Sequence, residues 1–314
     1  MALRQTCSVR PDDPALGPAT VTVAAVNFDA IPRDPTATAR KIASLTGDAA
    51  AAGADLVVFP ELALNTWGVC EQCAAAHRPC AWHLDQAEPA DGASFETIRA
   101  AAQAHGIHVI YGFEELGDDT GTIHNSANVV SPDGLVGTYR KLHLGIPLET
   151  DRFIPGSALP VFDTALGPIG ISICYDFYNN PELCRVLALK GARILVNPTG
   201  RSDLPRARQN LEHATLVRAQ ENLVYAVSAN RVGDRHGPRW AGGSVIGGPR
   251  FPGFGVVLAR AGQEEELIVA DLDFAELAKW YDWLPWREWR AGPQKAITQL
   301  VADELDALAA DEGS

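Results

Sequence analysis

Short apolar runs rich in β-branched residues alternate with amphipathic, alanine-rich stretches along most of this chain. The run ATVTVAAVNF at residues 19–28 has the β-branched density of a buried strand. Asp34 and Pro35 then supply an N-cap acceptor and a first-turn proline, which predict a helix that ends near Gly53. A strand at 55–59 follows, so the pattern opens as strand, helix, strand.

The same alternation continues toward the C-terminus. Helices are predicted at 94–105, from about Pro181 onward, and at 209–221. Further strands are predicted at 108–111, 126–130, 135–139, 168–173, 194–196, 223–229, 256–258 and 267–270, with a late β segment at Val245. The turn at 131–134, Ser-Pro-Asp-Gly, joins two of these strands as a hairpin. We therefore predict one α/β domain over 19–290, a disordered or extended tail at 1–18, and a helical tail at 291–314 that lies at a subunit interface.

Composition narrows the class of protein. The 314 residues are 46% hydrophobic and 21% charged, which is typical of a globular protein with a sizeable core. The net charge of −13 disfavours a nucleic-acid or anionic-membrane partner, because both would attract a basic surface. The first 19 residues lack the apolar core of a signal peptide, and the six cysteines are unevenly spaced. We expect a cytoplasmic protein without a disulfide framework and without a membrane partner.

Three reactive side chains follow three predicted strands. Glu61 comes after the strand at 55–59, Lys141 after 135–139, and Cys174 after 168–173. Sites in α/β proteins assemble beyond strand ends, where the connecting loops converge. A carboxylate can accept the proton of a thiol, while an ammonium group stabilises the oxyanion that forms when sulfur attacks an amide or nitrile carbon. The backbone N–H after the thiol would be a second oxyanion donor.

The sequence around these residues resembles the nitrilase superfamily of carbon–nitrogen hydrolases. The segments VVFPEL at 57–62, YRKLHL at 139–144 and GISICYD at 170–176 resemble its three signature blocks, in the family's order. The segments at 181–200, 218–233 and 242–249 extend the resemblance to nearly the whole chain, about 21–273. The resemblance implies a single-domain four-layer α-β-β-α sandwich that assembles into a homodimer or larger homo-oligomer.

The resemblance also implies roles for individual residues. Glu61 would be the general base, Lys141 the oxyanion stabiliser and proton relay, and Cys174 the nucleophile. A second acid usually follows the lysine, and here Glu149 is favoured over Asp151. No metal or organic cofactor is implied.

Residues near the thiol bear on the substrate. The string Cys-Tyr-Asp at 174–176 is similar to many amidases of the family, whereas members that act on nitriles typically read Cys-Trp-Glu. No arginine follows at 177–182, which disfavours a carbamoyl-amino-acid hydrolase. Substrate contacts are expected from Tyr175, Trp67, Phe177, Tyr178, Thr199 and Arg201. Phe177 and Tyr178 would form an aromatic wall or else pack in the core, and Arg201 would pair with an anionic substrate group or else be an ordinary loop residue.

The segment WGVCEQCAAAHRPCAWHL at 67–84 is unusual. Cys70, Cys73, His77, Cys80 and His83 have ligand types that suit zinc. All of these candidates fall within 14 residues, from 70 to 83, whereas structural sites usually pair two doublets from separate elements. We therefore expect a lid or pocket loop beside Glu61 rather than a metal site or a disulfide.

The leading function is a thiol-dependent amidase that acts on a small molecule and releases ammonia or an amine. A nitrilase, an N-carbamoyl hydrolase and an amide-forming acyltransferase are alternatives on the same fold. A catalytically silent binding protein is a further alternative, disfavoured because a scaffold has no need of this set of three reactive groups.

Overall fold

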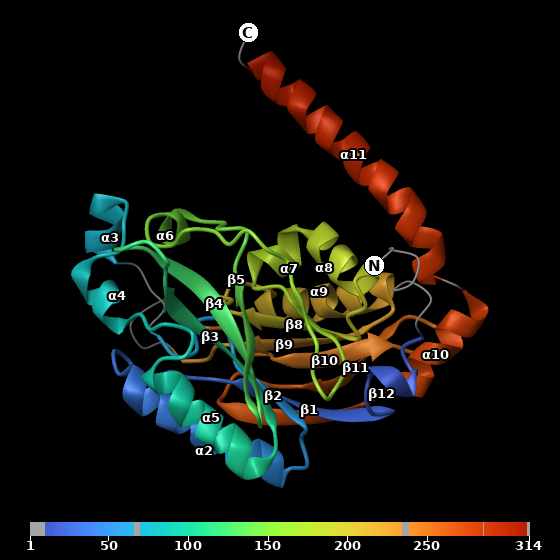
Figure 1. Cartoon of the computed structure of the whole chain (residues 1–314), viewed down its shortest axis with the longest axis horizontal. Coiled ribbons are helices and arrows are strands. Elements are labelled where there is room, and N and C mark those ends of the chain that lie inside the picture. Colours follow the sequence, from blue (N-terminus) through green and yellow to red (C-terminus); the bar gives the residue numbers. More distant parts are fainter. Residues whose placement is uncertain (1–9, 66–69, 234–238, 285, 313–314) are drawn as a thin grey trace.

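Two six-stranded β-sheets pack face to face in the computed structural model of the chain (Figure 1). The structure describes residues 10–65, 70–233, 239–284 and 286–312. The first sheet has the order β12-β1-β2-β3-β4-β5, and the second has the order β11-β10-β9-β8-β7-β6. Trp67, expected to contact substrate, and Cys7 lie outside the described residues.

Both sheets are built on the same plan. In each, three central strands are parallel and the outer strands are antiparallel to their neighbours. The strands of the first sheet are β1 (Thr20–Asn27), β2 (Leu56–Val58), β3 (His108–Leu116), β4 (Ile123–Ser131), β5 (Gly134–Arg140) and β12 (Glu266–Asp273). Those of the second are β6 (Val161–Phe162), β7 (Ile169–Ile171), β8 (Ile194–Thr199), β9 (Tyr225–Asn230), β10 (Val245–Pro249) and β11 (Gly255–Arg260).

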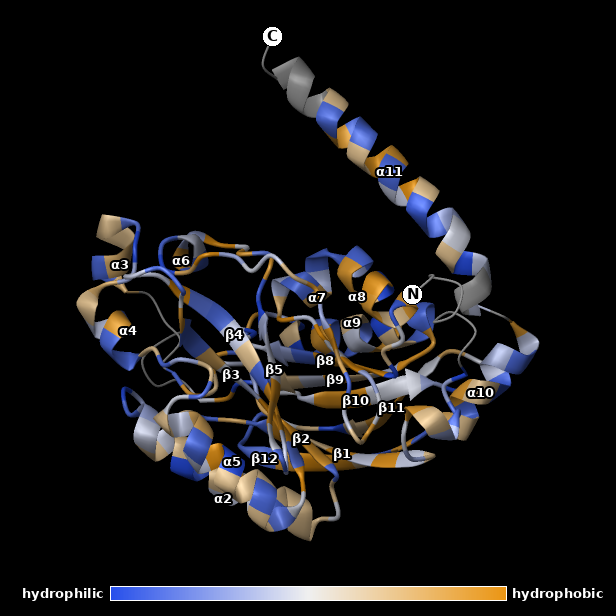
Figure 2. Ribbon diagram, in the orientation of Figure 1, coloured by the Kyte–Doolittle hydropathy of each residue, from blue (hydrophilic) through white to orange (hydrophobic). Residues whose placement is uncertain are grey.

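The main core lies between the two sheets. In β1, Val21, Val23 and Ala25 belong to this inter-sheet core, whereas Ala24 and Val26 pack on the opposite face against helices. Because both faces of the strand are buried, it reads as a continuous apolar run rather than as an alternating one. Figure 2 shows the hydrophobic residues gathered along the strands of both sheets.

Helices cover the outer face of each sheet. The first sheet is covered by α2 (Pro35–Ala51) and α5 (Ala93–His105), and the second by α8 (Pro181–Leu189) and α9 (Ala207–Asn222). As predicted, Asp34 caps α2, its side chain accepting the Ala37 N–H at 2.8 Å, and Pro35 opens the helix. The layers are therefore helix, sheet, sheet and helix, which confirms the predicted four-layer α/β sandwich.

The remaining elements of the described residues are helical. These are the 3₁₀ turn Pro14–Leu16, α3 (Glu71–Ala76), α4 (Ala81–Gln86), α6 (Pro147–Thr150), α7 (Tyr175–Asn179), α10 (Phe274–Trp283) and α11 (Trp286–Glu312). Helix α11 extends away from the sandwich in Figure 1. None of the helices in the described ranges is both long and apolar enough to cross a membrane.

The predicted strand at 108–111 is too short. Strand β3 continues to Leu116 because it pairs with β4 along its whole length, from Val109 opposite Val130 to Leu116 opposite Ile123. The carboxylates of Glu114 and Glu115 break the apolar pattern in the sequence. Both carboxylates are buried, but each has a partner, His83 for Glu114 and Arg140 for Glu115. Because these partners compensate for the cost of burial, the strand can continue through two charged residues.

Candidate active site

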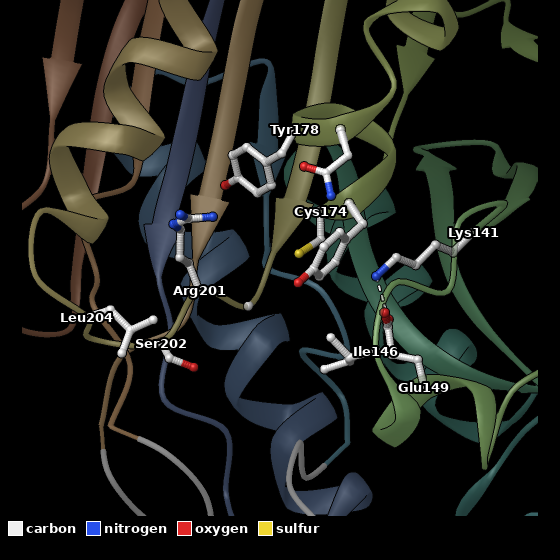
Figure 3. Close-up of a pocket in the computed structure, with 11 residues that line it drawn as sticks. Lys141, Ile146, Glu149, Cys174, Tyr178, Arg201, Ser202 and Leu204 are labelled. Atoms are coloured by element: carbon white, nitrogen blue, oxygen red, sulfur yellow. Dashed lines mark hydrogen bonds and ion pairs between the residues drawn. The ribbon is translucent and has the colours of Figure 1, made fainter.

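The side chains at three strand ends meet at one edge of the sandwich. Glu61 lies just beyond β2, Lys141 directly after β5, and Cys174 three residues after β7. Strands β2 and β5 run in the same direction, because β2 is parallel to β3 and two antiparallel steps separate β3 from β5. Their carboxyl ends therefore share an edge, and Figure 3 shows Lys141, Glu149 and Cys174 around one pocket there.

Lys141 connects two buried carboxylates. Its Nζ lies 2.8 Å from Glu61 Oε1 and 2.5 Å from Glu149 Oε1, and all three side chains are about 1% exposed. Desolvation of a buried ion costs several kcal/mol, so such a cluster is retained for its chemistry more readily than for stability. Burial by itself would lower the pKa of Lys141, but the negative charges of Glu61 and Glu149 raise it above its ordinary value, which keeps the ammonium charged.

Glu61 is held by hydrogen bonds at both oxygens. Oε1 also accepts the Asn125 side-chain N–H at 2.8 Å, and Oε2 accepts the Gly200 backbone N–H at 3.0 Å. The turn that carries Glu61 is fixed from behind by Arg231, whose Nη1 donates to the carbonyls of Glu61 at 3.1 Å and Leu62 at 2.6 Å. Three segments remote in sequence, which carry Asn125, Gly200 and Arg231, thus hold the carboxylate and its turn.

The second carboxylate on Lys141 is Glu149, not Asp151. The side chain of Glu149 is on α6, is fully buried, and also accepts the Gly145 backbone N–H through Oε2 at 2.9 Å. Asp151 instead pairs with His77, its Oδ1 lying 2.6 Å from His77 Nδ1. Burial raises the pKa of Glu149, and the neighbouring charge of Glu61 raises it further, while Lys141 opposes both.

Cys174 occupies a strained turn between β7 and α7. Its φ of 48° and ψ of −103° are unusual for a residue with a side chain. Its own N–H donates to Asn197 Oδ1 at 3.0 Å. As the first residue of α7, Tyr175 has no acceptor within the helix for its N–H, so that donor is available beside the thiol. Burial raises the pKa of Cys174 to about 12, and the charge of Glu61 also raises it, against Lys141 and a hydrogen bond with Thr199.

Asp176 holds the turn that presents Lys141. Its Oδ1 accepts the His143 N–H at 2.7 Å, and its Oδ2 accepts the Leu142 N–H at 3.1 Å and the Tyr139 hydroxyl at 2.7 Å. Sequence reasoning used Asp176 only to separate branches of the family. It missed this positioning role, as it missed Asn125 and Arg231, since nothing local to a residue reports what it contacts from another strand. The one signal in the sequence was the polar side chain of Asn125, directly before the predicted strand at 126–130.

A cavity of about 390 Å³ opens beside the thiol (Figure 3). Among the residues expected to contact substrate, Tyr175, Tyr178 and Arg201 line it. The Tyr175 ring also lies 5.5 Å from Lys141 Nζ, and the Arg201 guanidinium lies 5.0 Å from the Tyr178 ring centroid. Polar and aliphatic lining residues not anticipated from the sequence are Ile146, Asn179, Gly200, Ser202 and Leu204.

Two expected contacts lie behind the pocket surface. Thr199 is fully buried at the end of β8, where its hydroxyl lies 3.2 Å from the Tyr178 hydroxyl. Phe177 is fully buried in the cluster formed by α8 and α9, with Cys184 and Leu187 as neighbours. The prediction that Phe177 contacts substrate is therefore wrong: on α7 its ring lies on the face turned toward the outer helices.

Comparison with known proteins agrees with this geometry. The family model described as carbon-nitrogen hydrolase matches residues 22–282. A nitrilase of Pyrococcus abyssi is 35% identical over 235 residues, covering 74% of this chain and 82% of its own. An (R)-stereoselective amidase of a Pseudomonas species is 36% identical over 244 residues, covering 76% and 79%.

Solved structures show the same architecture. A Saccharomyces cerevisiae member of branch 10 of the nitrilase superfamily superposes with a TM-score of 0.73 at 25% identity, covering 85% of this chain and 94% of its own. A glutamate-to-glutamine variant of the amidase from Nesterenkonia sp. AN1 superposes with a TM-score of 0.67 at 26% identity, covering 82% and 92%. That variant shows covalent addition of the acetamide moiety of fluoroacetamide at its active site cysteine.

The fold and the site define an enzyme of the α-β-β-α sandwich class with a cysteine, a lysine and a glutamate at one pocket and a second glutamate, Glu61, bonded to the lysine. The chain belongs to the carbon–nitrogen hydrolase family. It is a hydrolase of carbon–nitrogen bonds other than peptide bonds, as its amidase relatives are.

Proposed function

We propose that the protein is a thiol amidase in which Cys174 attacks the amide carbon of a small molecule. The observation that carries this proposal is the position of the Lys141 ammonium, bonded to both Glu61 and Glu149, at the pocket that contains the Cys174 thiol. The raised pKa of Cys174 keeps the thiol protonated at rest, so a base must remove the proton during attack.

In the first half-reaction, Glu61 accepts the thiol proton as sulfur bonds to the carbonyl carbon. The electron pair of the C=O bond moves to oxygen, where the Lys141 ammonium and the Tyr175 N–H stabilise the negative charge. The oxyanion then collapses and the C–N bond breaks. The nitrogen takes up the proton held by Glu61, relayed by Lys141, and leaves as ammonia or an amine.

In the second half-reaction, water replaces the amine. Glu61 accepts a proton from water while the oxygen attacks the thioester carbon, and the same donors stabilise the second oxyanion. Breaking the C–S bond releases the carboxylic acid, and the proton returns to the Cys174 sulfur. Glu149 orients Lys141 throughout. The covalent adduct on the cysteine of the Nesterenkonia amidase supports a thiol nucleophile on this fold.

The pocket bears on the substrate class. A volume of about 390 Å³ lies at the lower end of the range for small-molecule sites. Arg201 lines the cavity, and no carboxylate among the described residues forms an ion pair with its guanidinium. This positive charge supports a substrate amide that carries an anionic group. Tyr175 and Tyr178 supply aromatic surface for the remainder of the molecule.

A screen with ammonia detection tests the proposal. Primary amides with and without a carboxylate, ureido acids and nitriles are incubated with the wild-type protein and with Cys174→Ala. Ammonia from at least one amide, formed by the wild type only, is the expected result. Ammonia from nitriles or ureido acids alone would replace the amidase proposal by one of the other family activities. A screen with added amine acceptors that yields new amides in place of acids would indicate an acyltransferase.

We also propose that copies of this chain associate through α11 into a homodimer or larger homo-oligomer in the cytoplasm. Exposed apolar side chains on α11 at i, i+3, i+4 and i+8 support an interface, namely Ile297, Leu300, Val301 and Leu305. The described cysteines are all unpaired, which fits a reducing compartment. Light scattering of the wild type and of a Leu300→Asp, Leu305→Asp variant tests the interface: an unchanged mass would refute it.

A further inference from the structure

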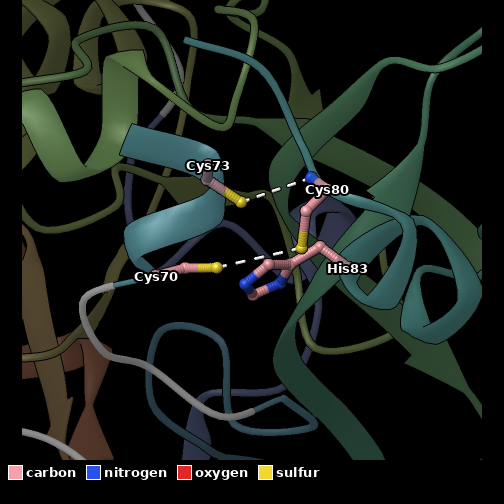
Figure 4. Close-up of side chains that lie close together, drawn as sticks. All are labelled: Cys70, Cys73, Cys80 and His83. Carbon is pink, nitrogen blue, oxygen red and sulfur yellow. Dashed lines mark hydrogen bonds between the residues drawn. The ribbon is translucent and has the colours of Figure 1, made fainter. Parts of the chain in front are cut away.

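Three thiols and one imidazole converge beside β3, away from the Cys174 pocket (Figure 4). The side chains are those of Cys70, Cys73, Cys80 and His83, and one ligand atom from each lies within 4.8 Å of the other three. The sulfurs of Cys70 and Cys80 are 3.8 Å apart. None of the described residues of this segment, 70–84, lines the 390 Å³ cavity, so these residues do not form the pocket wall that the sequence suggested.

The local fold explains why the four side chains meet. Cys70 and Cys80 are the N-cap residues of α3 and α4, and each is followed three positions later by a second donor, Cys73 or His83. A spacing of three places both donors of a pair on the same side of a helical turn. Helix α3 ends at Ala76, and the next residue, His77, has a φ of 48° that reverses the chain and returns α4 toward α3.

The reason for disfavouring a metal site from the sequence is therefore removed. The donors are close in sequence, from residue 70 to residue 83, but they form two doublets on two separate helices. That is the arrangement in which structural zinc sites present their ligands.

The distances suit one metal better than a disulfide. A tetrahedral zinc ion with Zn–S bonds of about 2.3 Å has its sulfurs about 3.8 Å apart, the separation of the Cys70 and Cys80 sulfurs. A disulfide needs sulfurs about 2.05 Å apart, so these two are not bonded. The Cys80 backbone N–H donates to Cys73 Sγ at 3.3 Å, a contact that would stabilise a thiolate ligand.

His83 is oriented by a buried carboxylate. Its Nδ1 lies 3.0 Å from Glu114 Oε2, and both side chains are almost completely buried. An ionised Glu114 requires Nδ1 to carry the proton, which leaves the lone pair on Nε2. A carboxylate behind a ligating imidazole is the usual way that proteins fix the tautomer for a metal. Arg152 Nη1 now lies 3.1 Å from Nε2, and a metal ion would take that lone pair in its place.

Arg152 also gives the cluster its charge balance. Three thiolates, a neutral imidazole and a divalent ion carry a net charge of about −1. Arg152 Nη1 lies 3.6 Å from Glu114 Oε1, so the guanidinium keeps a partner when it releases His83 and remains beside the anionic site. With four protein donors the site has no open coordination position, which is typical of structural rather than catalytic zinc.

We propose that Cys70, Cys73, Cys80 and His83 form a structural zinc site that holds α3 and α4 against β3 and the α6 turn. Binding displaces the thiol protons and forms three Zn–S bonds and one Zn–N bond. The link to α6 runs from His83 through Glu114 to Arg152, three residues after Glu149, and a second link runs from His77 to Asp151. The metal would thus support the turn that carries Glu149 without touching substrate.

Metal analysis of the full chain tests the site. The protein is produced with zinc in the medium and purified with a phosphine reductant and without chelator. We expect about one zinc per chain in the wild type and less than about a tenth of that in a Cys70→Ser, Cys73→Ser variant. His77→Asn is the matched control, because His77 lies in the same segment with an 80% exposed side chain, and it should retain the zinc.

Cobalt gives a readout that does not depend on the folding of a variant. The wild-type protein is stripped with a chelator under reductant and reloaded with Co²⁺ alone. Intense visible bands of tetrahedral cobalt with thiolate charge transfer are the expected result. The proposal is overturned if the wild type holds no zinc and gives no tetrahedral cobalt spectrum. It is also overturned if the double serine variant keeps its zinc, or if Cys70 and Cys80 are joined by a disulfide in the metal-free protein.

Discussion

Asp176 Oδ1 accepts the backbone N–H of His143 at 2.7 Å, and this contact joins the turn after Cys174 to the turn after Lys141. Cys174 follows a strand of one sheet and Lys141 follows a strand of the other. The relative position of the thiol and the ammonium therefore depends on hydrogen bonds between the two turns that carry them. A carboxylate with three donors around it fixes that position more firmly than packing alone, because each hydrogen bond to a charged group contributes about 1.5–3 kcal/mol.

Replacing Asp176 tests this positioning role. Asp176→Asn puts an N–H group where one of the backbone N–H donors now points, so we expect kcat to fall roughly 10- to 100-fold with little change in KM. Tyr139→Phe removes only the hydroxyl donor and should lower kcat less. Steady-state kinetics on both variants, with thermal unfolding as a check of the fold, give the answer. If KM rose and kcat fell to a similar extent in both variants, the effect would be a general structural defect instead.

Cys174→Ala is expected to abolish turnover and to leave the fold intact. The side chain is small and the strained backbone at 174 is fixed by its neighbours, so circular dichroism and melting temperature should change little. Cys184→Ala is the matched control, since Cys184 is also a buried free thiol but lies on α8 in the outer core cluster, away from the pocket. Measurable turnover by a folded Cys174→Ala protein would refute the thiol mechanism.

Replacing Glu61 and replacing Glu149 are expected to slow different steps of the reaction. Glu61→Gln cannot accept a proton, so formation and hydrolysis of the thioester should both slow by about 10²- to 10⁴-fold. Glu149→Gln should slow the first step more than the second, because Glu149 orients Lys141 and only the first step needs Lys141 to relay a proton to the leaving nitrogen. Mass spectrometry after mixing with substrate follows the adduct on Cys174. An adduct trapped in Glu149→Gln, with rapid deacylation in Glu61→Gln, would reverse the two assignments.

The free enzyme should show no thiolate at Cys174 in the neutral range. Burial raises the pKa of Cys174 to about 12, above its ordinary value, so the protonated form persists until strongly alkaline pH. The ultraviolet thiolate absorbance of wild type minus Cys174→Ala should therefore stay flat between about pH 6 and about pH 9. A rise in that difference below about pH 8 would mean that the resting nucleophile is already ionised.

Arg201 should set selectivity for anionic amides. Arg201→Met keeps the length and apolar stem of the side chain but removes the charge, so KM for a carboxylate-bearing amide should rise roughly 10- to 100-fold. KM for a neutral amide of similar size should change little. Arg260→Met, at an exposed position of β11, is the control. Equal KM changes for both amides would show that Arg201 acts through packing on Tyr178.

Local sequence determined much of this protein. The β-branched runs and the helix signals at Asp34 and Pro35 specify their elements because their physical causes act within a few residues. The strand ends then pointed to Glu61, Lys141 and Cys174, since residues just beyond the end of a strand lie at the edge of the sheet, where loops converge. The resemblance of the blocks around them to one family gave the layered fold.

Tertiary structure decided what depends on contacts between distant segments. Glu149 and Asp151 are two positions apart and chemically similar, and only the orientation of α6 puts one on Lys141 and the other on His77. Phe177 and Tyr178 are adjacent, yet the turn of α7 sends one ring to the core and the other to the pocket. The donors at residues 70–83 looked too crowded for a metal until the chain reversal at His77 separated them onto two helices. In each case the outcome depends on the direction of a side chain, which is set by packing against elements far away in the sequence.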